Sequence, residues 1–482
     1  MRDPADADPV SAAVRVLQCG RHRAALALLL AMAAGSARAQ APVPAFAPSF
    51  IAGTRDATGH FMGGTEIRTL VTHGGKLFAG NGYWKDVPGP EGTPGAQVLV
   101  LDGPQAPWRL DASFDDPLPG GRRRHQAISA LAEATFRTDG QGKALPAPRT
   151  VLLASTWDVT GARTVFVRDD AAGTWSGAVL AQDRSTRDFL PQIRTFGTHR
   201  DHITGADTVF AGDTRGIFAG VHDPAVSGGI GWGASPELKL TADMASGPGL
   251  AGRLRISSFA EAGGRLFAAI GRQVWVRQDG AGPQWRLLYT NPMPFYSQTG
   301  LRGLTAIVEP DGHEALLAAV EGNKSRIVRI DPETGADVTD LDLDGLLDQT
   351  WCTKVSYVVA AYNDMPRLPV SGGSAVLIGL EAFIPPASPR PPGHTVLNVN
   401  HGLEAGAWFL LCRPGGHYEL REVRAEGALV NKALVAVRVA QASPFPNEAG
   451  VVYLGGYDAN DFPAHDTAWI ALSRLEFDAR LP

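Results

Sequence analysis

The chain has 482 residues, a formal net charge of −5 and 19% charged residues. Binding to nucleic-acid phosphates needs a concentrated basic surface, so this charge argues against a nucleic-acid partner while leaving room for a local basic pocket. Glycine (56 residues) and proline (35) are abundant. Such a composition favours many short strands joined by tight turns over long solvated helices.

The N-terminal region has the pattern of a secretory signal peptide. A basic stretch at 21–23 precedes the apolar run AALALLLAMAAG, and Ala-Arg-Ala follows at 37–39. The apolar run is shorter than the ~20 helical residues that span a bilayer, so we expect no transmembrane anchor in the mature chain. We therefore expect residues 1–39 to be removed and the protein to be periplasmic or secreted.

Beyond this region the chain repeats one pattern of strands. EIRTLVTHGGKLFAGNG (66–82) and RLRISSFAEAGGRLFAAIG (253–271) each read as strand, glycine turn and strand, followed by a third strand and a turn ending in Trp108 or Trp285. RTVFVRDDAAGTWSG, with Trp175, is a third copy. Apolar and polar residues alternate with period two, so four such strands make an antiparallel sheet that needs cover on both faces. Stacking neighbouring sheets around a ring provides that cover.

This pattern resembles that of secreted bacterial β-propeller repeat proteins. The expected fold is all-β: a single propeller of about seven four-stranded antiparallel blades, at residues 67–111, 126–181, 192–241, 253–290, 300–346, 352–424 and 432–476. We expect residues 40–66 to form an N-terminal segment, 67–476 the propeller and 477–482 a tail. Residues 48–53 are predicted to supply a strand that closes the ring and covers a sheet edge. The fold alone does not set the chemistry.

Three long loops are predicted on one face, between the second and third strands of blades that adjoin if the ring closes. They cover residues 83–96, 385–406 and 458–466. Long loops on a rigid scaffold usually carry binding or chemistry. The candidates there are His401, His465, Tyr457, Asp458 and Asp466 for catalysis, and Trp84, Asn400 and Asn460 for ligand binding. Histidine beside carboxylates can supply a general base. Alternatively, Asp and Asn shape the turns and His caps a loop.

Arginine recurs at the start of the innermost strand of four blades. EIRTL, QIRTF, RLRIS and GLRGL place Arg68, Arg194, Arg255 and Arg302 at one repeat position. Repeat symmetry would bring these side chains to the mouth of the central channel, where guanidinium forks suit carboxylate, sulfate or phosphate. The alternative is that each arginine pairs with an acid or carbonyl of the neighbouring blade as a structural staple.

One acidic motif matches a calcium loop. DLDLDGLLD (340–348) offers Asp340, Asp342, Asp344 and Asp348 as oxygen ligands for a structural calcium ion. The same residues also read as an outer strand. Aspartates two positions apart on a strand lie ~6.6 Å from one another, too far for one ion.

These features predict a binding protein for an anionic or carbohydrate ligand, or for a partner protein, on the face with the long loops. The alternative is a polysaccharide lyase or glycoside hydrolase that acts on an anionic, uronate-type glycan at the same face. A lyase would use arginine to neutralise the uronate and His401 or His465, with Tyr457, to move the proton. A hydrolase would need two facing carboxylates, for which the candidates are Asp458, Asp461, Asp466 and Glu404.

Overall fold

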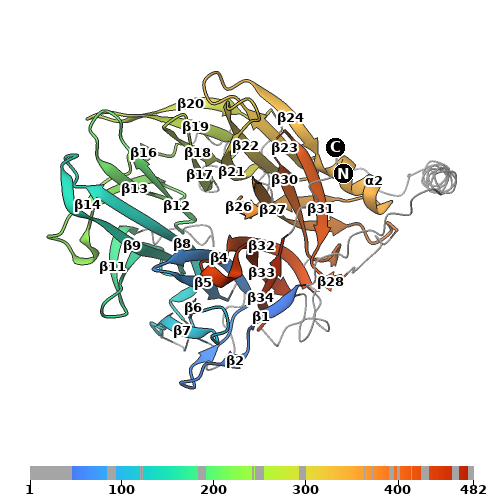
Figure 1. Ribbon diagram of the computed structural model, residues 1–482, viewed down its shortest axis with the longest axis horizontal. Helices are drawn as coiled ribbons and strands as arrows, with labels where there is room; N and C mark the ends of the chain where they lie inside the picture. The colour runs from blue at the N-terminus through green and yellow to red at the C-terminus, as the bar shows by residue number, and fades with distance from the viewer. Residues whose placement is uncertain are drawn as a thin grey trace.

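The computed structural model describes residues 46–83, 94–119, 121, 123–182, 192–241, 244, 254–292, 300–362, 364–370, 373–389, 396–398, 402–413, 415–424, 434–458 and 466–475. Within them the protein is all-β, and its antiparallel sheets are arranged around a centre (Figure 1). None of the helices in these ranges has the length and apolar character needed to cross a membrane. The predicted signal peptide (1–39) and C-terminal tail (477–482) lie outside the described residues.

The first half of the chain forms successive four-stranded units. The first two comprise β4 (Glu66–His73), β5 (Lys76–Gly82), β6 (Ala96–Leu101) and β7 (Arg109–Phe114), then β8 (His125–Thr138), β9 (Ala144–Asp158), β10 (Ala162–Asp169) and β11 (Thr174–Gln182). The pairing of Gly82 with Ala127 joins these two units into one eight-stranded sheet. The next two comprise β12 (Thr195–Arg200), β13 (Asp207–Gly212), β14 (Gly216–His222) and β15 (Ile230–Trp232), with η1 (Ser227–Gly229) and β16 (Leu238–Lys239), then β17 (Ile256–Ala262), β18 (Arg265–Ile270), β19 (Gln273–Gln278) and β20 (Gln284–Thr290).

The second half follows the same plan with one elaborated sheet. Its first unit comprises β21 (Gly300–Val308), β22 (Glu314–Glu321), β23 (Arg326–Ile330) and β24 (Asp337–Asp342), followed by the helix α2 (Leu343–Trp351). The elaborated sheet comprises β25 (Tyr357–Ala360), β26 (Arg367–Val370), β27 (Gly373–Ile384), β28 (Val396–Asn398), β29 (Gly402–Glu404), β30 (Trp408–Arg413) and β31 (His417–Glu422). The last comprises β32 (Leu434–Ala442), β33 (Val451–Asp458) and β34 (Ala468–Arg474), with η5 (Pro446–Glu448).

The fourth strand of the last sheet comes from the other end of the chain. β1 (Ala47–Ile51) pairs antiparallel with β34, with Phe50 opposite Ile470. The segment predicted to supply this strand, residues 48–53, therefore does pair there through Pro48, Phe50 and Ile51. A short ladder of β2 (Thr54–Arg55) and β3 (Phe61–Met62) then leads into β4.

Apolar layers separate the sheets. The middle strands are buried on both faces; all six residues of β6, for example, are buried. Buried clusters lie between consecutive sheets, and one that includes Ile67 and Ile470 lies between the last sheet and the first. The inner strands contact one another in the order β4, β8, β12, β17, β21 and β25, then β27 contacts β32 and β32 contacts β4. Each sheet thus covers its neighbour's apolar face, as the repeat requires.

The helix α2 was not expected, because the predicted fifth blade ran through residue 346 and the next was to begin at 352. Instead β24 ends at Asp342, whose carboxylate accepts a hydrogen bond from the Gly345 amide and caps the helix. Leu343, Leu347 and Trp351 are buried on one side of the helix. Their spacing of four residues gives a helical apolar stripe, which overrides the alternating pattern read for a strand.

Candidate functional site

The inner strands bring arginines from five sheets into one cluster at the centre. Arg68 lies on β4, Arg194 directly precedes β12, and Arg255 directly precedes β17. Arg302 lies on β21 and Arg438 on β32. The charges of Arg68, Arg255 and Arg302 act on Arg194, and the charge of Arg438 acts on Arg302. We call these five residues the arginine cluster.

β-Bulges help to direct these side chains inward. The register of the inner strand shifts between Ile67 and Thr69, between Leu301 and Gly303, and again on either side of Val437. The residues passed over in the pairing include Arg68, Arg302 and Arg438. An extra residue in one strand bends it and re-aims a side chain, which is how bulges commonly serve functional sites.

Three buried glutamates partner four of the arginines. Glu66 lies 3.3 Å from Nε of Arg68 and 3.4 Å from Nε of Arg438. Nη1 of Arg438 lies 2.8 Å from Glu381. Glu321 pairs with Arg302 at 3.2 Å and, more weakly, with Arg255 at 3.7 Å. The alternative of a staple to the neighbouring blade therefore has support for Arg255 and Arg438, whose partners lie on other sheets, whereas Arg68 and Arg302 pair within their own sheets.

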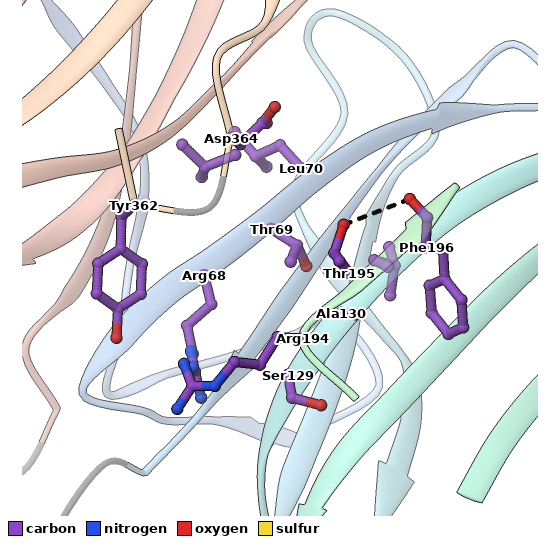
Figure 2. A pocket seen from close by; sticks show the side chains of 12 residues that line it. Arg68, Thr69, Leu70, Ser129, Ala130, Arg194, Thr195, Phe196, Tyr362 and Asp364 are labelled. Atoms are coloured by element: carbon purple, nitrogen blue, oxygen red, sulfur yellow. Dashed lines mark hydrogen bonds between the residues drawn. The ribbon is translucent and has the colours of Figure 1, made fainter. Parts of the chain in front are cut away.

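Arg194 differs from the other four. Its side chain is 4% exposed, and its Nε has no hydrogen-bond partner. In the part of the chain that the structure describes, no carboxylate forms an ion pair with it. It lines a cavity of about 150 Å³ together with Arg68, Ser129, Tyr362 and Asp364. Figure 2 shows Arg68 and Arg194 extending their guanidinium groups toward the same region of this cavity.

The pKa values of the arginines also separate Arg194 from Arg438, which has glutamate partners. Burial and the nearby Arg255 hold the pKa of Arg194 well below its usual range. Burial opposes the charged form of Arg438 too, but Glu381 outweighs it and raises the pKa of Arg438. Arginine does not lose its proton in proteins, so Arg194 stays charged in surroundings that disfavour its charge. An anion in the cavity would supply the missing charge.

Tyr362 stands among the guanidiniums. The guanidinium carbon of Arg438 lies 4.0 Å from the centroid of its ring, that of Arg302 at 4.5 Å and that of Arg68 at 6.0 Å. Asp364, two residues further on, lines the same cavity, and burial raises its pKa to about 6. The site thus contains several guanidinium groups, the phenol of Tyr362 and the carboxyl group of Asp364, which changes charge in mildly acidic conditions.

Only some of the site residues predicted on the face with the three long loops lie within the described chain. Tyr457 donates a 2.5 Å hydrogen bond to Glu381 and lies under the guanidinium of Arg438, at 5.1 Å, so it belongs to the central network. Asp466 accepts hydrogen bonds from Tyr83 and from the Gly64 amide, which links the loops of the first and last sheets. Asp458 and Glu404 are buried. His401, His465, Trp84, Asn400, Asn460 and Asp461 lie outside the described residues.

The four aspartates of the predicted calcium loop face separate partners. Asp340 pairs with Arg329 and accepts from Tyr418, whereas Asp342 caps α2. Asp344 accepts from the Ser325 amide, and Asp348 pairs with Lys354. The described residues contain no group of three or more His, Cys, Asp or Glu side chains that could hold a metal ion. These carboxylates stabilise strand, cap and turn.

Several central residues are absent from the predicted site. Arg438 interrupts the apolar strand LVAVRV, and a charge in so apolar a strand is a usable signal of an inward role. Tyr362, Asp364 and Glu381 carry no such signal, because they belong to the blade whose sequence departs most from the repeat.

No protein-family model matches the chain, and no curated protein matches it. Solved structures similar to it include the extracellular domain of a hybrid two-component system from B. thetaiotaomicron (11% identity, TM-score 0.43, covering 90% of this chain and 40% of that one). Others are Trypanosoma rangeli sialidase in complex with sialic acid (11%, 0.37, 89% and 57%) and the WD40 β-propeller domain of Doa1 (10%, 0.40, 89% and 97%). The chain spans less than two thirds of the first two. At these scores the likenesses carry no argument about function.

Proposed function

We propose that the protein is an exported, closed seven-bladed β-propeller that binds a small anion in the cavity lined by Arg68 and Arg194. The observation that carries this proposal is Arg194, a buried guanidinium without a carboxylate partner among the described residues. A buried charge is tolerated when it is paired and hydrogen-bonded, so such an arginine calls for an anionic ligand. The circular order of contacts between inner strands supports the closed ring.

The chemistry of the cluster favours an oxyanion. Guanidinium groups donate paired hydrogen bonds that match carboxylate, sulfate and phosphate. The five arginines outnumber the three glutamates that pair with them, so the site keeps a surplus of positive charge. The register places Glu66 opposite Gly82 and Gly300 opposite Glu321, so the cluster lies at the end of the strands where β5 and β22 finish. A sugar that carries a carboxylate or sulfate would reach the cluster from that end.

Isothermal titration of the purified protein tests this proposal. The ligands are sulfate, inorganic phosphate, glucuronate and, as a neutral sugar, glucose. We expect the anions to bind and glucose not to bind. Arg194→Gln should weaken anion binding by about 10- to 100-fold, because a hydrogen bond to a charged group contributes ~1.5–3 kcal/mol.

Arg286→Gln is the matched control, because Arg286 is exposed on the outer strand β20. This variant should bind anions as the unaltered protein does. Equal affinity of the Arg194→Gln variant and the unaltered protein would refute the assignment of the cavity, as would binding of glucose alone. The lyase or hydrolase alternative depends on His401 and His465 and stays a prediction.

A further inference from the structure

Tyr362 occupies an interruption of the inner edge of its sheet. β25 pairs with residues 380–383 of β27, and β26 pairs with residues 373–376 of the same strand. The chain leaves the sheet between them at Ala361, which has a positive φ of 57°. A non-glycine residue in this conformation is strained, and such strain persists where the surrounding structure enforces it. The consequence is that Tyr362 sits among the guanidiniums rather than in the sheet.

The neighbouring sheet is shaped to accept this segment. A Cβ atom added to Gly303 of β21 would lie 2.6 Å from Cβ of Ala361 and 2.7 Å from Cγ of Met365. Glycine at this position therefore permits a close approach that any side chain would block. Because Gly303 directly follows Arg302, the same stretch of β21 supplies both the contact for the segment and a guanidinium above the phenol ring.

Tyr362 is the common neighbour of the whole arginine cluster. Arg68, Arg302 and Arg438 lie within 6.0 Å of its ring centroid, and its charge also acts on Arg194 and Arg255. The charge of Glu66 from β4 acts on it, and Asp364 from its own segment lines the same cavity. Glu321 from β22 and Glu381 from β27 lie against Arg302 and Arg438. Glu66, Glu321 and Glu381 are already engaged with arginines, so they leave the surplus positive charge in place.

We propose that the phenolate of Tyr362 balances the charge of the arginine cluster in the ligand-free protein. When an anion binds, it replaces the phenolate as the counter-charge, and Tyr362 takes up a proton. The inference rests on the proposed anion site. The phenolate oxygen accepts a proton from solvent as the ligand arrives, and no other bond is made or broken.

The direction of the Tyr362 pKa supports this exchange. Burial and Glu66 oppose ionisation, but Arg68, Arg438 and Arg302 outweigh them and hold the pKa of Tyr362 below its ordinary value. The other tyrosines near the cluster behave oppositely. Burial and then Glu321 raise the pKa of Tyr357, and burial and then Glu381 raise that of Tyr457. Tyr362 is therefore the tyrosine of this region that the cluster favours as an anion.

Near-ultraviolet spectroscopy of the full chain without ligand reads the phenolate directly. As the pH is raised, we expect a tyrosinate band that appears below the ordinary tyrosine pKa of ~10. The band should vanish in Tyr362→Phe and persist in the matched control Tyr357→Phe. Absence of the band, or its persistence in Tyr362→Phe, would overturn the inference.

Calorimetry of the unaltered protein with sulfate gives a second measurement that needs no variant. Titration in two buffers of different ionisation enthalpy should show uptake of a substantial fraction of a proton, and the tyrosinate band should fade as sulfate binds. Sulfate binding without proton uptake would overturn this inference and leave the anion site standing. A tyrosinate band together with no binding of any anion would instead overturn the proposed function and the exchange that depends on it.

The affinity of the Tyr362→Phe variant for sulfate shows whether Tyr362 acts as a counter-charge or contacts the ligand. Removing a competing negative charge should let sulfate bind several-fold more tightly, at a pH where the unaltered protein shows the tyrosinate band. Weaker binding by a variant with an unchanged melting temperature would show that the hydroxyl contacts the ligand as a neutral donor, which would refute the exchange.

Discussion

Replacing Arg194 by methionine should stabilise the ligand-free protein. Methionine matches much of the arginine stem in length, and it removes a guanidinium that is 4% exposed and has no carboxylate partner in the described part of the chain. Replacing buried charge by a packed apolar group is often neutral or stabilising, by about 1–4 kcal/mol. We expect Arg194→Met to raise the free energy of unfolding by about 1–3 kcal/mol.

The matched variant Arg302→Met should have the opposite effect. Arg302 is equally buried, but its Nε lies 3.2 Å from Glu321. Its loss leaves that buried carboxylate with the more distant Arg255, at 3.7 Å. Breaking a buried pair costs about 3–5 kcal/mol, and we expect the lower end because Arg255 remains. The two substitutions are chemically identical, so only the pairing distinguishes them.

Differential scanning calorimetry in buffer free of sulfate, phosphate and carboxylates measures both effects. For a chain of this size one kcal/mol corresponds to roughly 1 °C in melting temperature, because the unfolding entropy scales with length. Arg194→Met should therefore melt about 1–3 °C higher than the unaltered protein and Arg302→Met about 3 °C lower. Sulfate at 100 times its Kd should stabilise the unaltered protein by ~2.7 kcal/mol. It should not stabilise Arg194→Met, so the higher melting temperature of this variant should shrink or reverse in saturating sulfate. If Arg194→Met melts as low as Arg302→Met without anions, the reasoning fails.

Three further predictions concern residues outside the cavity wall. Burial opposes the charged form of His199, but Glu261 and Asp279 outweigh it and raise its pKa, so this contribution to stability is full below about pH 6.5 and is lost as pH rises through the raised value. His199→Gln should therefore lower the melting temperature more at about pH 5.5 than at about pH 8.5. Asp342→Ala removes the cap of α2 and should cost about 0.5–2 kcal/mol in chemical denaturation, equally with calcium and with chelator. Gly303→Val should cost about 1–3 kcal/mol and abolish sulfate binding, because its side chain would collide with the segment that carries Tyr362.

Each of these has a clear contrary result. A constant difference in melting temperature across pH would show that His199 does not carry a charge in the folded state. A denaturation midpoint of Asp342→Ala that depends on calcium would revive the calcium loop. Full sulfate affinity in Gly303→Val would show that Tyr362 and its segment do not shape the cavity.

The amino-acid sequence by itself determined the repeat. Alternation with period two and glycine turns are local properties, so they predict antiparallel strands without knowledge of the partner strands. The common position of Arg68, Arg194, Arg255 and Arg302 is also readable, because equivalent positions in a repeat occupy equivalent places in space. The strand near residues 48–53, now seen as β1, could be assigned because the last sheet lacked an outer strand.

Only the tertiary structure decided which of these arginines is paired. Glu66, Glu321 and Glu381 come from different sheets, and their distances to the guanidiniums depend on β-bulges whose positions follow from strand register. The placement of Tyr362 depends likewise on a break in its sheet and on the space above Gly303. Register and close approach arise between segments far apart in the chain, so no local pattern encodes them. That is why the sequence could predict an arginine-rich centre, whereas the unpaired cation and the phenol beside it had to be seen in three dimensions.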